Sequence, residues 1–316
     1  MNKEREVGHR GTGEAGDIEG ALERGVPLAP YTSFRIGGPA RFFMQPRSIE
    51  QFGDTIAWAL KRSIPFFVLG GGANVLVHER GFDGLIIHTG KLQRIDISGT
   101  TLQAECGVHV DALVDAALDQ GLAGLEFAAG LPGTVGGALF MNARAYEGEF
   151  SKVVASVRAL KVRGRKIGED RLLRDELAFS YKHSLIQRGG LYVYSARFEL
   201  EAGERDGIAA RIADIRSRRL EAGQFFFPNA GCIFKNRYDI GKSTGRIIDE
   251  LGLKGTRIGD AEVYQKHANF IVNRGAATAD DVYRLIRLIE AAVARRLGLR
   301  IEREIRLIGP WCEDDT

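Results

Sequence analysis

The chain has 316 residues, a length that favours two or three domains over a single hydrophobic core. Its 44% hydrophobic and 27% charged residues are ordinary for a soluble globular protein, and its formal net charge of +3 comes without a block of Lys or Arg, so we expect no nucleic-acid partner. No run of about 18 apolar residues predicts a membrane span, and no apolar segment follows the polar N-terminus to predict a secretory signal.

The N-terminal segment and the cysteines set two further expectations. Residues 1–19 contain glycines and charges but almost no large apolar side chain, which predicts a disordered tail. Cys106, Cys232 and Cys312 are odd in number and lack metal-ligand spacing. We therefore expect a cytoplasmic protein with no disulfide framework and no metal site.

Short strands, turns and one helix are predicted for the first part of the chain. The apolar run Pro65-Phe-Phe-Val-Leu69 ends in a cluster of glycines, and residues 74–77 continue from that cluster as a second strand. Residues 85–88 predict a third strand. Apolar residues at helical spacing between Asp111 and Gln120, followed by Gly121, predict a helix.

Strands and helices alternate in the rest of the chain. Strands are predicted at 156–162, 191–200 and 301–308, and helices at 208–220, 244–251 and 278–297. Thr278-Ala-Asp-Asp281 resembles a capping box at the start of the last helix, and Gly298 ends it. We place the main domain boundary at residues 203–207. The arginines from Arg211 to Arg219 favour a solvated helix face, with an anion-facing patch as the alternative.

Two glycine-rich turns are the most informative part of the sequence: Gly70-Gly71-Gly72-Ala73-Asn74 and Gly130-Leu-Pro-Gly133-Thr-Val-Gly136-Gly137. Glycine lets bare backbone N–H groups approach a ligand closely, and successive amides that point into one concavity form a nest for phosphate groups. Two such turns indicate a large diphosphate-bearing cofactor, and hence an enzyme. Neither turn is a Walker A motif or a clear Rossmann fingerprint. Turns that are glycine-rich for packing alone are the alternative.

Six segments resemble the ordered motifs of a known family. They are Tyr31-Thr-Ser-Phe-Arg35-Ile-Gly37-Gly-Pro-Ala40, Val68-Leu-Gly-Gly-Gly-Ala-Asn-Val-Leu-Val77, Gly124-Leu-Glu-Phe-Ala-Ala-Gly-Leu-Pro-Gly-Thr-Val-Gly-Gly137, Gly231-Cys-Ile-Phe-Lys-Asn236, Lys266-His-Ala-Asn-Phe-Ile-Val-Asn273 and Glu304-Ile-Arg306. From about residue 28 to 309, the chain resembles the UDP-N-acetylenolpyruvoylglucosamine reductases, also called UDP-N-acetylmuramate dehydrogenases, of bacterial peptidoglycan synthesis. Its length is more similar to the shorter, type II form.

The resemblance implies an α/β fold with an FAD-binding domain of the vanillyl-alcohol-oxidase (PCMH) type. Two subdomains, at residues 20–95 and 96–205, would form it, and a C-terminal α/β substrate-binding domain would follow at 206–316. Neither glycine turn contains a histidine or a cysteine, so we expect noncovalent FAD. The implied FAD-binding residues are Arg35, Gly70, Gly71, Gly72, Ala73, Asn74, Val75, Leu76, Gly130, Gly133, Thr134, Gly136, Gly137 and Asn142.

The resemblance also implies a reaction in two halves. NADPH would reduce the flavin, and a hydride would then reach C3 of the enolpyruvyl group of UDP-N-acetylglucosamine enolpyruvate. A proton would arrive at C2 to give UDP-N-acetylmuramate. Negative charge develops on the substrate in this step, so the enzyme needs a cation and a proton donor.

Three residues take the catalytic roles by resemblance. Cys232 stands where most members of the family carry a serine proton donor, and a thiol is a stronger acid than an aliphatic hydroxyl. Lys182 stands where arginine is usual, which replaces a bidentate fork by a point charge. Glu304 is implied in binding or protonation at C2. The alternatives are a buried small cysteine, a surface lysine and a solvated Glu/Arg ladder.

Five further residues are substrate-binding candidates. Arg144 stands where glycine is commoner and could supply a cation, and Tyr181 precedes Lys182. Asn236, Lys254 and His267 correspond to positions near the sugar diphosphate. Each of these three could instead be solvated or a helix cap.

Two other functions stay open from the sequence. The substitutions at positions 144, 182 and 232 fit a catalytically weak paralogue that binds FAD and a nucleotide sugar. An oxidase on the same flavin scaffold is the other alternative.

Overall fold

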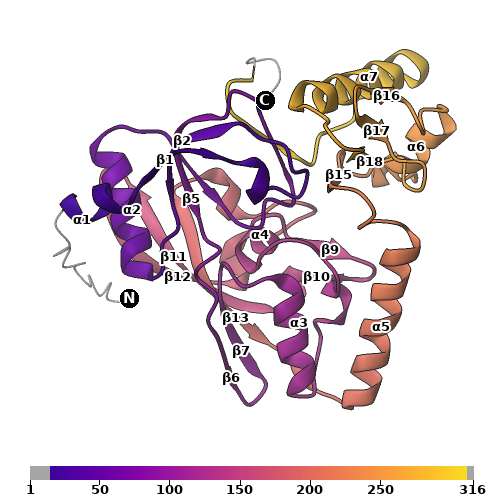
Figure 1. The fold of residues 1–316 in the computed structure, drawn as a ribbon. Helices are drawn as coiled ribbons and strands as arrows, with labels where there is room; N and C mark the ends of the chain where they lie inside the picture. The colour runs from indigo at the N-terminus through magenta and orange to yellow at the C-terminus, as the bar shows by residue number, and fades with distance from the viewer. Residues whose placement is uncertain (1–14, 312–316) are drawn as a thin grey trace. The chain divides into compact units, whose positions relative to one another are not determined.

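The computed structural model describes residues 15–311 and has a mixed α/β fold (Figure 1). The described chain forms two compact units. The first contains residues 15–24, 42–71 and 84–216, and the second contains residues 25–41, 72–83 and 217–311. The second unit therefore includes two segments from the N-terminal third of the chain. The division at residues 95 and 205 into two FAD-binding subdomains and a substrate-binding domain stays a prediction.

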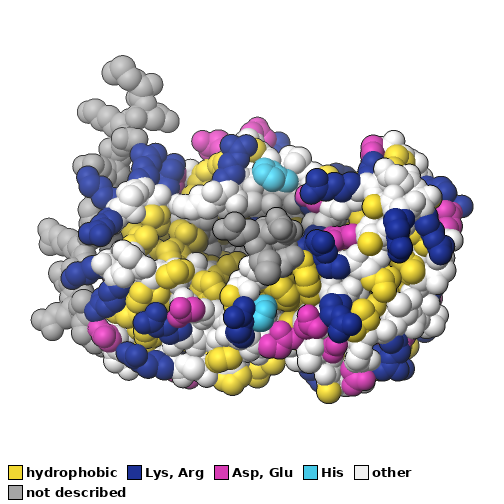
Figure 2. Space-filling view, turned by 90° about the horizontal axis from the view of Figure 1, so that it is seen from above, with side chains coloured by type: hydrophobic (Ala, Val, Ile, Leu, Met, Phe, Trp, Pro, Cys, Tyr) yellow, Lys and Arg dark blue, Asp and Glu magenta, His cyan; other side chains and the backbone are white. Residues whose placement is uncertain are grey.

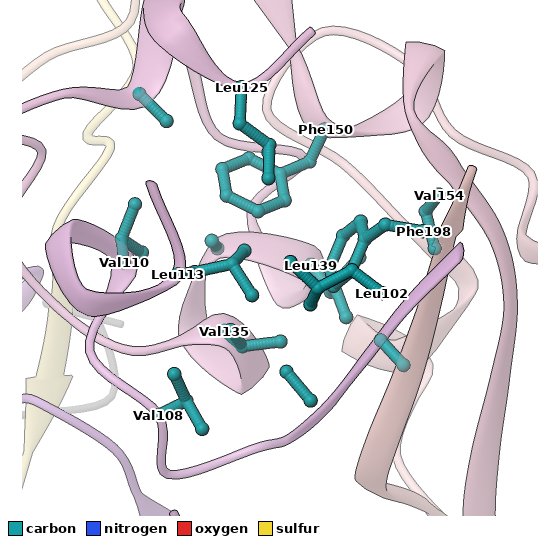
Figure 3. Packing of buried hydrophobic residues seen from close by; sticks show 14 of the residues in the cluster. Leu102, Val108, Val110, Leu113, Leu125, Val135, Leu139, Phe150, Val154 and Phe198 are labelled. Atoms are coloured by element: carbon teal, nitrogen blue, oxygen red, sulfur yellow. The ribbon is translucent and has the colours of Figure 1, made fainter. Parts of the chain in front are cut away.

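A five-stranded antiparallel sheet in the order β12-β11-β13-β7-β6 forms the centre of the first unit. Its strands are β6 (Ile95–Ser98), β7 (Thr101–Glu105), β11 (Val154–Arg163), β12 (Lys166–Leu173) and β13 (Leu191–Glu199). Helices α3 (Val110–Asp119) and α4 (Val135–Phe140) pack on one face of the sheet. Leu113 and Leu139 from these helices share one buried cluster with Leu102 and Phe198 from the strands (Figure 3). The predicted helix at 111–120 and strands at 156–162 and 191–200 are confirmed.

A second sheet has the order β1-β2-β5-β3. It consists of β1 (Glu23–Pro27), β2 (Pro39–Met44), β3 (Phe66–Leu69) and β5 (Phe82–His88). Strand β3 pairs in parallel with β5, with Phe66 opposite Leu85. Helix α2 (Ile49–Lys61), whose N-terminus is capped by Ser48, buries Phe52 and Ile56 in one cluster with Leu85.

The last part of the predicted N-terminal tail is helical. Residues 15–19 belong to helix α1 (Ala15–Ala21), so the prediction that they are disordered was wrong. Ile18 is buried in the same cluster as Phe52, and Glu19 forms an ion pair with Arg62 at 2.6 Å. Burial of the single residue Ile18 thus anchors this otherwise polar segment on the first unit. Residues 1–14, and with them most of the predicted tail, lie outside the described residues, as does Cys312.

The second unit contains a four-stranded antiparallel sheet in the order β15-β18-β17-β16. Its strands are β15 (Asn229–Cys232), β16 (Arg257–Ile258), β17 (Ala261–Val263) and β18 (Phe270–Asn273), and helices α6 (Thr244–Glu250) and α7 (Ala279–Leu297) accompany them. Strand β4 (Val75–Val77) pairs in parallel with β19 (Arg306–Ile308). Leu76, Ile248 and Leu285 lie in one buried cluster of this unit.

Helix α7 begins and ends where the sequence predicts. Thr278 Oγ1 accepts from Asp281 N, the Asp281 carboxylate accepts from Thr278 N, and Gly298 follows the helix with φ of 63°. The predicted strand 301–308 is regular only over Arg306–Ile308. Ile301 and Ile305 are nevertheless buried, as the alternation predicts.

The remaining elements are short apart from one helix. They are the pair β8 (Leu122–Ala123) with β14 (Glu201–Ala202), the pair β9 (Arg144–Ala145) with β10 (Gly148–Glu149), helix α5 (Arg205–Glu221), and the 3-10 helices Ala29–Tyr31, Glu126–Ala128, Phe150–Lys152, Arg174–Leu177, Leu185–Arg188 and Tyr238–Ile240.

The charged surface is mixed in sign. On the face drawn in Figure 2, Lys and Arg side chains are interspersed with Asp and Glu side chains. Arg211 pairs with Glu126 at 2.5 Å, and Arg216 pairs with Asp111 at 2.8 Å. These arginines therefore belong to an ion-paired helix face. Among residues 15–311, every helix is too short or too polar to cross a bilayer.

Candidate functional site

The two glycine turns meet in the first unit. A Cβ atom added to Gly71 would lie 2.7 Å from Gly133 Cα and 3.4 Å from Thr134 N, and one added to Gly70 would lie 2.5 Å from Thr134 Oγ1. Contacts this short leave no room for a side chain at either position. Gly130 and Gly133 have φ of 69° and 109°, a region that glycine tolerates. Close approach of two backbones therefore explains these glycines locally.

Thr134 adds an observation that packing does not explain. Its side chain is 2% exposed, and its Oγ1 is buried without a hydrogen-bond partner among the described residues. Thr134 precedes α4 as its N-cap residue but makes no side-chain capping bond. An unpaired buried hydroxyl costs about 1–3 kcal/mol, and an acceptor oxygen of a ligand would remove that cost. The Thr134 hydroxyl and the side-chain-free backbone around it fit an oxygen of FAD.

Gly136 and Gly137 begin helix α4 directly after this hydroxyl. Gly136 N donates to Cys106 O at 2.9 Å, and a Cβ atom on Gly136 would lie 3.0 Å from Cys106 Cβ. Gly137 N lies 3.9 Å from the position of a Cβ atom on Gly70. Burial raises the pKa of Cys106 to about 12, so this thiol is unreactive and serves as packing.

Two other predicted FAD residues use their polar groups within the protein. Gly130 N donates to Asp111 Oδ1 at 2.8 Å. Asn142 is 1% exposed; its Nδ2 donates to Ser180 O at 3.1 Å, and its Oδ1 accepts from Ser151 N at 3.0 Å. Asn142 therefore holds the segment that carries Tyr181 and Lys182, and its direct contact with FAD stays a prediction.

Lys182 lies in a tight turn. Ser180 N donates to His183 O at 3.1 Å, and His183 N donates to Ser180 O at 3.2 Å. Lys182 has φ of 55°, a strained value for a residue with a long side chain. The Arg144 guanidinium lies 5.5 Å from the Tyr181 ring centroid, so the first unit brings three predicted site residues, Arg144, Tyr181 and Lys182, together.

The sequence analysis missed the residues that hold this turn in place. Gln187 Nε2 donates to Lys182 O at 3.0 Å and to Phe140 O at 2.7 Å. Ser184 is fully buried and donates to the same Phe140 carbonyl at 2.8 Å. The turn is thereby attached to the C-terminal end of α4, and this attachment offsets the strain at Lys182.

His88 supports the first glycine turn and was also missed. Its Nδ1 lies 2.7 Å from Gln45 Nε2, and its ring stacks on Phe43 with the centroids 6.0 Å apart. Burial, and to a smaller extent electrostatic repulsion from His109 and Lys91, lowers the pKa of His88 from 6.5 to about 4, and a hydrogen bond with the Gly70 backbone opposes this shift in part. The His88 imidazole that is hydrogen-bonded to the Gly70 backbone is therefore neutral at physiological pH.

In the second unit, the continuation of the first turn contacts the segment around Arg35. A Cβ atom on Gly72 would lie 2.1 Å from Tyr31 O, and Ser33 N donates to Gly72 O at 3.1 Å. Arg35 is exposed and has φ of 56°. Thr32 Oγ1 donates to Ile36 O at 2.9 Å and so closes the bend at Arg35. The unit thus holds the bend that carries Arg35 in the segment that contacts Gly72.

Asn74 joins the glycine turn to the C-terminal segment. Its Nδ2 donates to Glu304 O at 3.1 Å, and Arg306 N donates to Asn74 O at 3.0 Å. Val75 and Leu76 are buried in β4, so only their backbones could contact a cofactor. The half-buried Ala73 lies between Gly72 and Asn74. The hydrogen bond from Asn74 to Glu304 therefore connects the predicted FAD-binding turn to a predicted catalytic residue.

Cys232 and Glu304 lie on neighbouring segments of the second unit. Glu304 N donates to Ile233 O at 2.7 Å, directly after Cys232, and Phe234 pairs with Arg303. Cys232 is half-buried at the end of β15, opposite Phe270. The structure thus brings the predicted proton donor and the predicted carboxylate to adjacent positions.

Two asparagines hold this pair of segments. Asn269 is 1% exposed; its Oδ1 accepts from Phe234 N at 3.0 Å, and its Nδ2 donates to Phe234 O at 2.8 Å. Asn273 Nδ2 donates to Phe34 O at 3.1 Å, next to Arg35. The two asparagines of the motif at 266–273 therefore position neighbouring backbone segments. Amide side chains at both ends of a buried apolar run are the sequence signal for such a role.

Helix α6 is the common neighbour of the three predicted diphosphate contacts. Asn236 Oδ1 accepts from Thr244 N at 3.1 Å, and Lys254 pairs with Asp249 at 2.7 Å. A Cβ atom on Gly245 would lie 3.7 Å from His267 Cε1. His267 Nδ1 is buried without a hydrogen-bond partner among the described residues, and burial together with Lys254 lowers the pKa of His267.

This arrangement suits an uncharged contact better than an ionic one. The lowered pKa makes His267 a neutral hydrogen-bonding group, and the neighbouring Lys254 is paired with Asp249. Asn236 acts in part as a cap of α6, as the sequence analysis allowed. Across residues 15–311, no three His, Cys, Asp or Glu side chains cluster as metal ligands would.

Comparisons with known proteins identify the family of the chain. Residues 40–167 match the family model of the FAD binding domain, and residues 222–308 match that of the UDP-N-acetylenolpyruvoylglucosamine reductase, C-terminal domain. The chain is 38% identical over 293 residues to such a reductase from Clostridium novyi, covering 93% of this chain and 94% of the other. It is 41% identical over 303 residues to one from Moorella thermoacetica, covering 94% and 98%.

Structural similarity leads to the same family. The crystal structure of a UDP-N-acetylenolpyruvylglucosamine reductase from Thermus caldophilus aligns with a TM-score of 0.76 and 34% identity, covering 91% of this chain and 98% of the other. The expected family, its α/β fold and its FAD cofactor are thereby confirmed. The chain belongs to the UDP-N-acetylenolpyruvoylglucosamine reductases, a family of flavin-dependent oxidoreductases.

Proposed function

We propose that this chain reduces UDP-N-acetylglucosamine enolpyruvate to UDP-N-acetylmuramate in peptidoglycan synthesis, with NADPH as the hydride donor. The observation that carries the proposal is the bond from Glu304 N to Ile233 O, because it holds a carboxylate-bearing segment beside Cys232. A double-bond reduction of this kind needs a proton at a defined carbon. The second unit holds two groups that can carry one.

FAD would be held noncovalently by the glycine turns and the Thr134 hydroxyl, and when bound it supplies a hydride. The missing side chains of Gly70, Gly71 and Gly133 let the two turns approach each other, and Thr134 offers a hydroxyl that has no hydrogen-bond partner among the described residues. Arg35, held in its bend by Thr32, would add a positive charge for the diphosphate. His88 and Gln45 would keep the Gly70 backbone in position.

The chain's own residues then account for the proton and the charge. Cys232 would donate a proton to C2 of the enolpyruvyl group, and Glu304 would bind or protonate the same part of the substrate. Lys182 would stabilise the negative charge that develops on the enolpyruvyl carboxylate. The fixed turn around Lys182 compensates in part for the missing arginine fork, because a positioned cation loses less entropy on binding.

The substrate diphosphate would lie at α6, near Lys254, His267 and Asn236. Arg144 and Tyr181 would be further substrate contacts. A neutral His267 donates or accepts a hydrogen bond without adding charge, so Lys254 would carry the electrostatic part of diphosphate binding.

An anaerobic flavin titration tests the proposal against its alternatives. The purified protein is reduced with NADPH, and UDP-N-acetylglucosamine enolpyruvate is then added while the flavin absorbance is followed. We expect bleaching followed by recovery. Recovery of the flavin absorbance only after oxygen is admitted would support an oxidase. A flavin that stays bleached after both the substrate and oxygen have been added would support the weak paralogue.

A further inference from the structure

Three arginines gather on the face of the five-stranded sheet that α3 and α4 do not cover. Leu102, Val157, Leu172 and Ala196 are buried in the cluster beneath those helices. Side chains alternate along a strand, so the neighbours of these residues lie on the other face. The neighbours Gln103, Ser156, Arg158, Arg171, Ser195 and Arg197 line a cavity of about 340 Å³.

The strand register brings like charges together. Arg158 lies directly opposite Arg171 on β12 and opposite Ser195 on β13. Arg197 lies opposite Ser156 on one side and opposite Gln103 on the other. Like charges at directly opposite positions destabilise a sheet. An anion between the guanidinium groups would remove that cost.

The protein's own carboxylates neutralise this cluster only in part. Arg158 pairs with Glu169 at 3.0 Å and Arg197 with Glu199 at 3.4 Å, all of them at least two-fifths exposed. Exposed pairs of this kind contribute about 0–1 kcal/mol and are easily rearranged. Arg171 forms no ion pair within the described chain, and Arg197 Nε is buried there without a hydrogen-bond partner.

Among the described residues that line the cavity, none is a carboxylate. Glu105 lies opposite Ser195, but its Oε2 accepts from Arg94 N at 2.9 Å and it is not a lining residue. The lining offers guanidinium, hydroxyl and amide donors, with Ser156 and Ser195 each 4% exposed at its floor. Guanidinium donors without a carboxylate among these lining residues favour an anion.

We infer that this cavity binds the phosphate group of a small phosphorylated molecule. The planar fork of arginine matches phosphate oxygens, and about 340 Å³ is at the small end of ligand sites. The site is separate from Thr134 and the glycine turns, because Thr134 begins α4 on the opposite face of the sheet.

Calorimetric titration of the FAD-saturated protein tests this inference. The probes are inorganic phosphate, pyrophosphate, ATP and citrate, each at the same ionic strength in chloride buffer. We expect pyrophosphate and ATP to bind to the native chain, and Arg171→Gln to weaken both by about tenfold or more. Arg163→Gln is the matched control, because Arg163 is exposed on the same β11–β12 pair outside the cavity.

The flavin and substrate sites also recognise phosphates, and the variants separate them from this cavity. Arg171→Gln should leave the rate of flavin reduction by NADPH unchanged. Arg197→Lys keeps the charge but removes the fork, and a tenfold loss of affinity is expected there too. Equal affinity of the native chain and both cavity variants, tighter binding of citrate than of every phosphate probe, or no heat with any phosphate probe would overturn the inference.

Discussion

The side-chain amide of Asn74 donates a hydrogen bond to the backbone carbonyl of Glu304 at 3.1 Å, although the two residues are 230 positions apart in the chain. The parallel pairing of β4 with β19 begins directly after them. The segment that the resemblance assigns to FAD binding is therefore held against the segment that it assigns to catalysis. The first prediction concerns this hydrogen bond.

Asn74→Asp should weaken the contact between the two segments, because a carboxylate cannot donate to the Glu304 carbonyl. We expect the free energy of unfolding to fall by about 1–3 kcal/mol, measured by urea denaturation, and flavin reoxidation by substrate to slow. Gln93→Glu is the control, since Gln93 Nε2 donates to Gly90 O at 2.7 Å on an exposed turn. Equal effects of the two substitutions would contradict the special role of Asn74.

Gly71→Ala should separate the glycine turns. The Cβ atom of the alanine would lie 2.7 Å from Gly133 Cα. Overpacking of this kind lowers the free energy of unfolding by about 1–3 kcal/mol. We expect the purified variant to lose most of its FAD, as measured by the ratio of flavin to protein absorbance. Gly168→Ala is the control, because nothing lies within 4 Å of a Cβ atom there. Normal flavin content in Gly71→Ala would show that the turns do not need this approach.

Thr134→Val separates stability from cofactor binding. Valine has nearly the shape of threonine and removes a hydroxyl that is buried without a partner in the described chain. The FAD-free protein should gain about 1 kcal/mol of unfolding free energy, whereas the affinity for FAD should fall by up to about tenfold. A variant that is less stable without FAD and binds FAD as tightly as the native chain would show that the hydroxyl serves the protein alone.

His88 should make the protein sensitive to acid. Its folded pKa of about 4 lies below the ordinary value of 6.5, so the unfolded chain takes up the proton first as pH falls. The stability from the neutral imidazole is complete above the unfolded pKa and is lost as pH falls toward the folded pKa, by at most about 3 kcal/mol. Urea unfolding of the native chain and of His88→Gln across this range measures the difference. The same pH dependence in both would exclude His88 as its source.

Local signals in the sequence predicted many of the elements. Thr278 and Asp281 predicted the start of α7, because a capping box depends only on residues close together in the sequence. Gly121 predicted the end of α3 for the same reason. The prediction of a disordered tail wrongly included residues 15–19, because the burial of Ile18 depends on residues far along the chain.

The candidate site shows the same limit. The glycine density around Gly71 indicated a ligand-binding turn, but its contact with Gly133 depends on tertiary structure. Asn269 and Asn273 stood in a recognised motif, yet their bonds to Phe234 and Phe34 could not be read from spacing. Buried polar side chains find partners across the fold, so positioning residues are harder to predict than the residues they position.

The half-reactions of Cys232→Ala and Cys232→Ser test the proposed chemistry most directly. NADPH should reduce the flavin at the native rate in both variants, because Cys232 has no assigned role in that step. Reoxidation by UDP-N-acetylglucosamine enolpyruvate should be abolished in Cys232→Ala and retained in Cys232→Ser, since a hydroxyl can still donate a proton. Native turnover by Cys232→Ala would contradict the assignment of the proton donor.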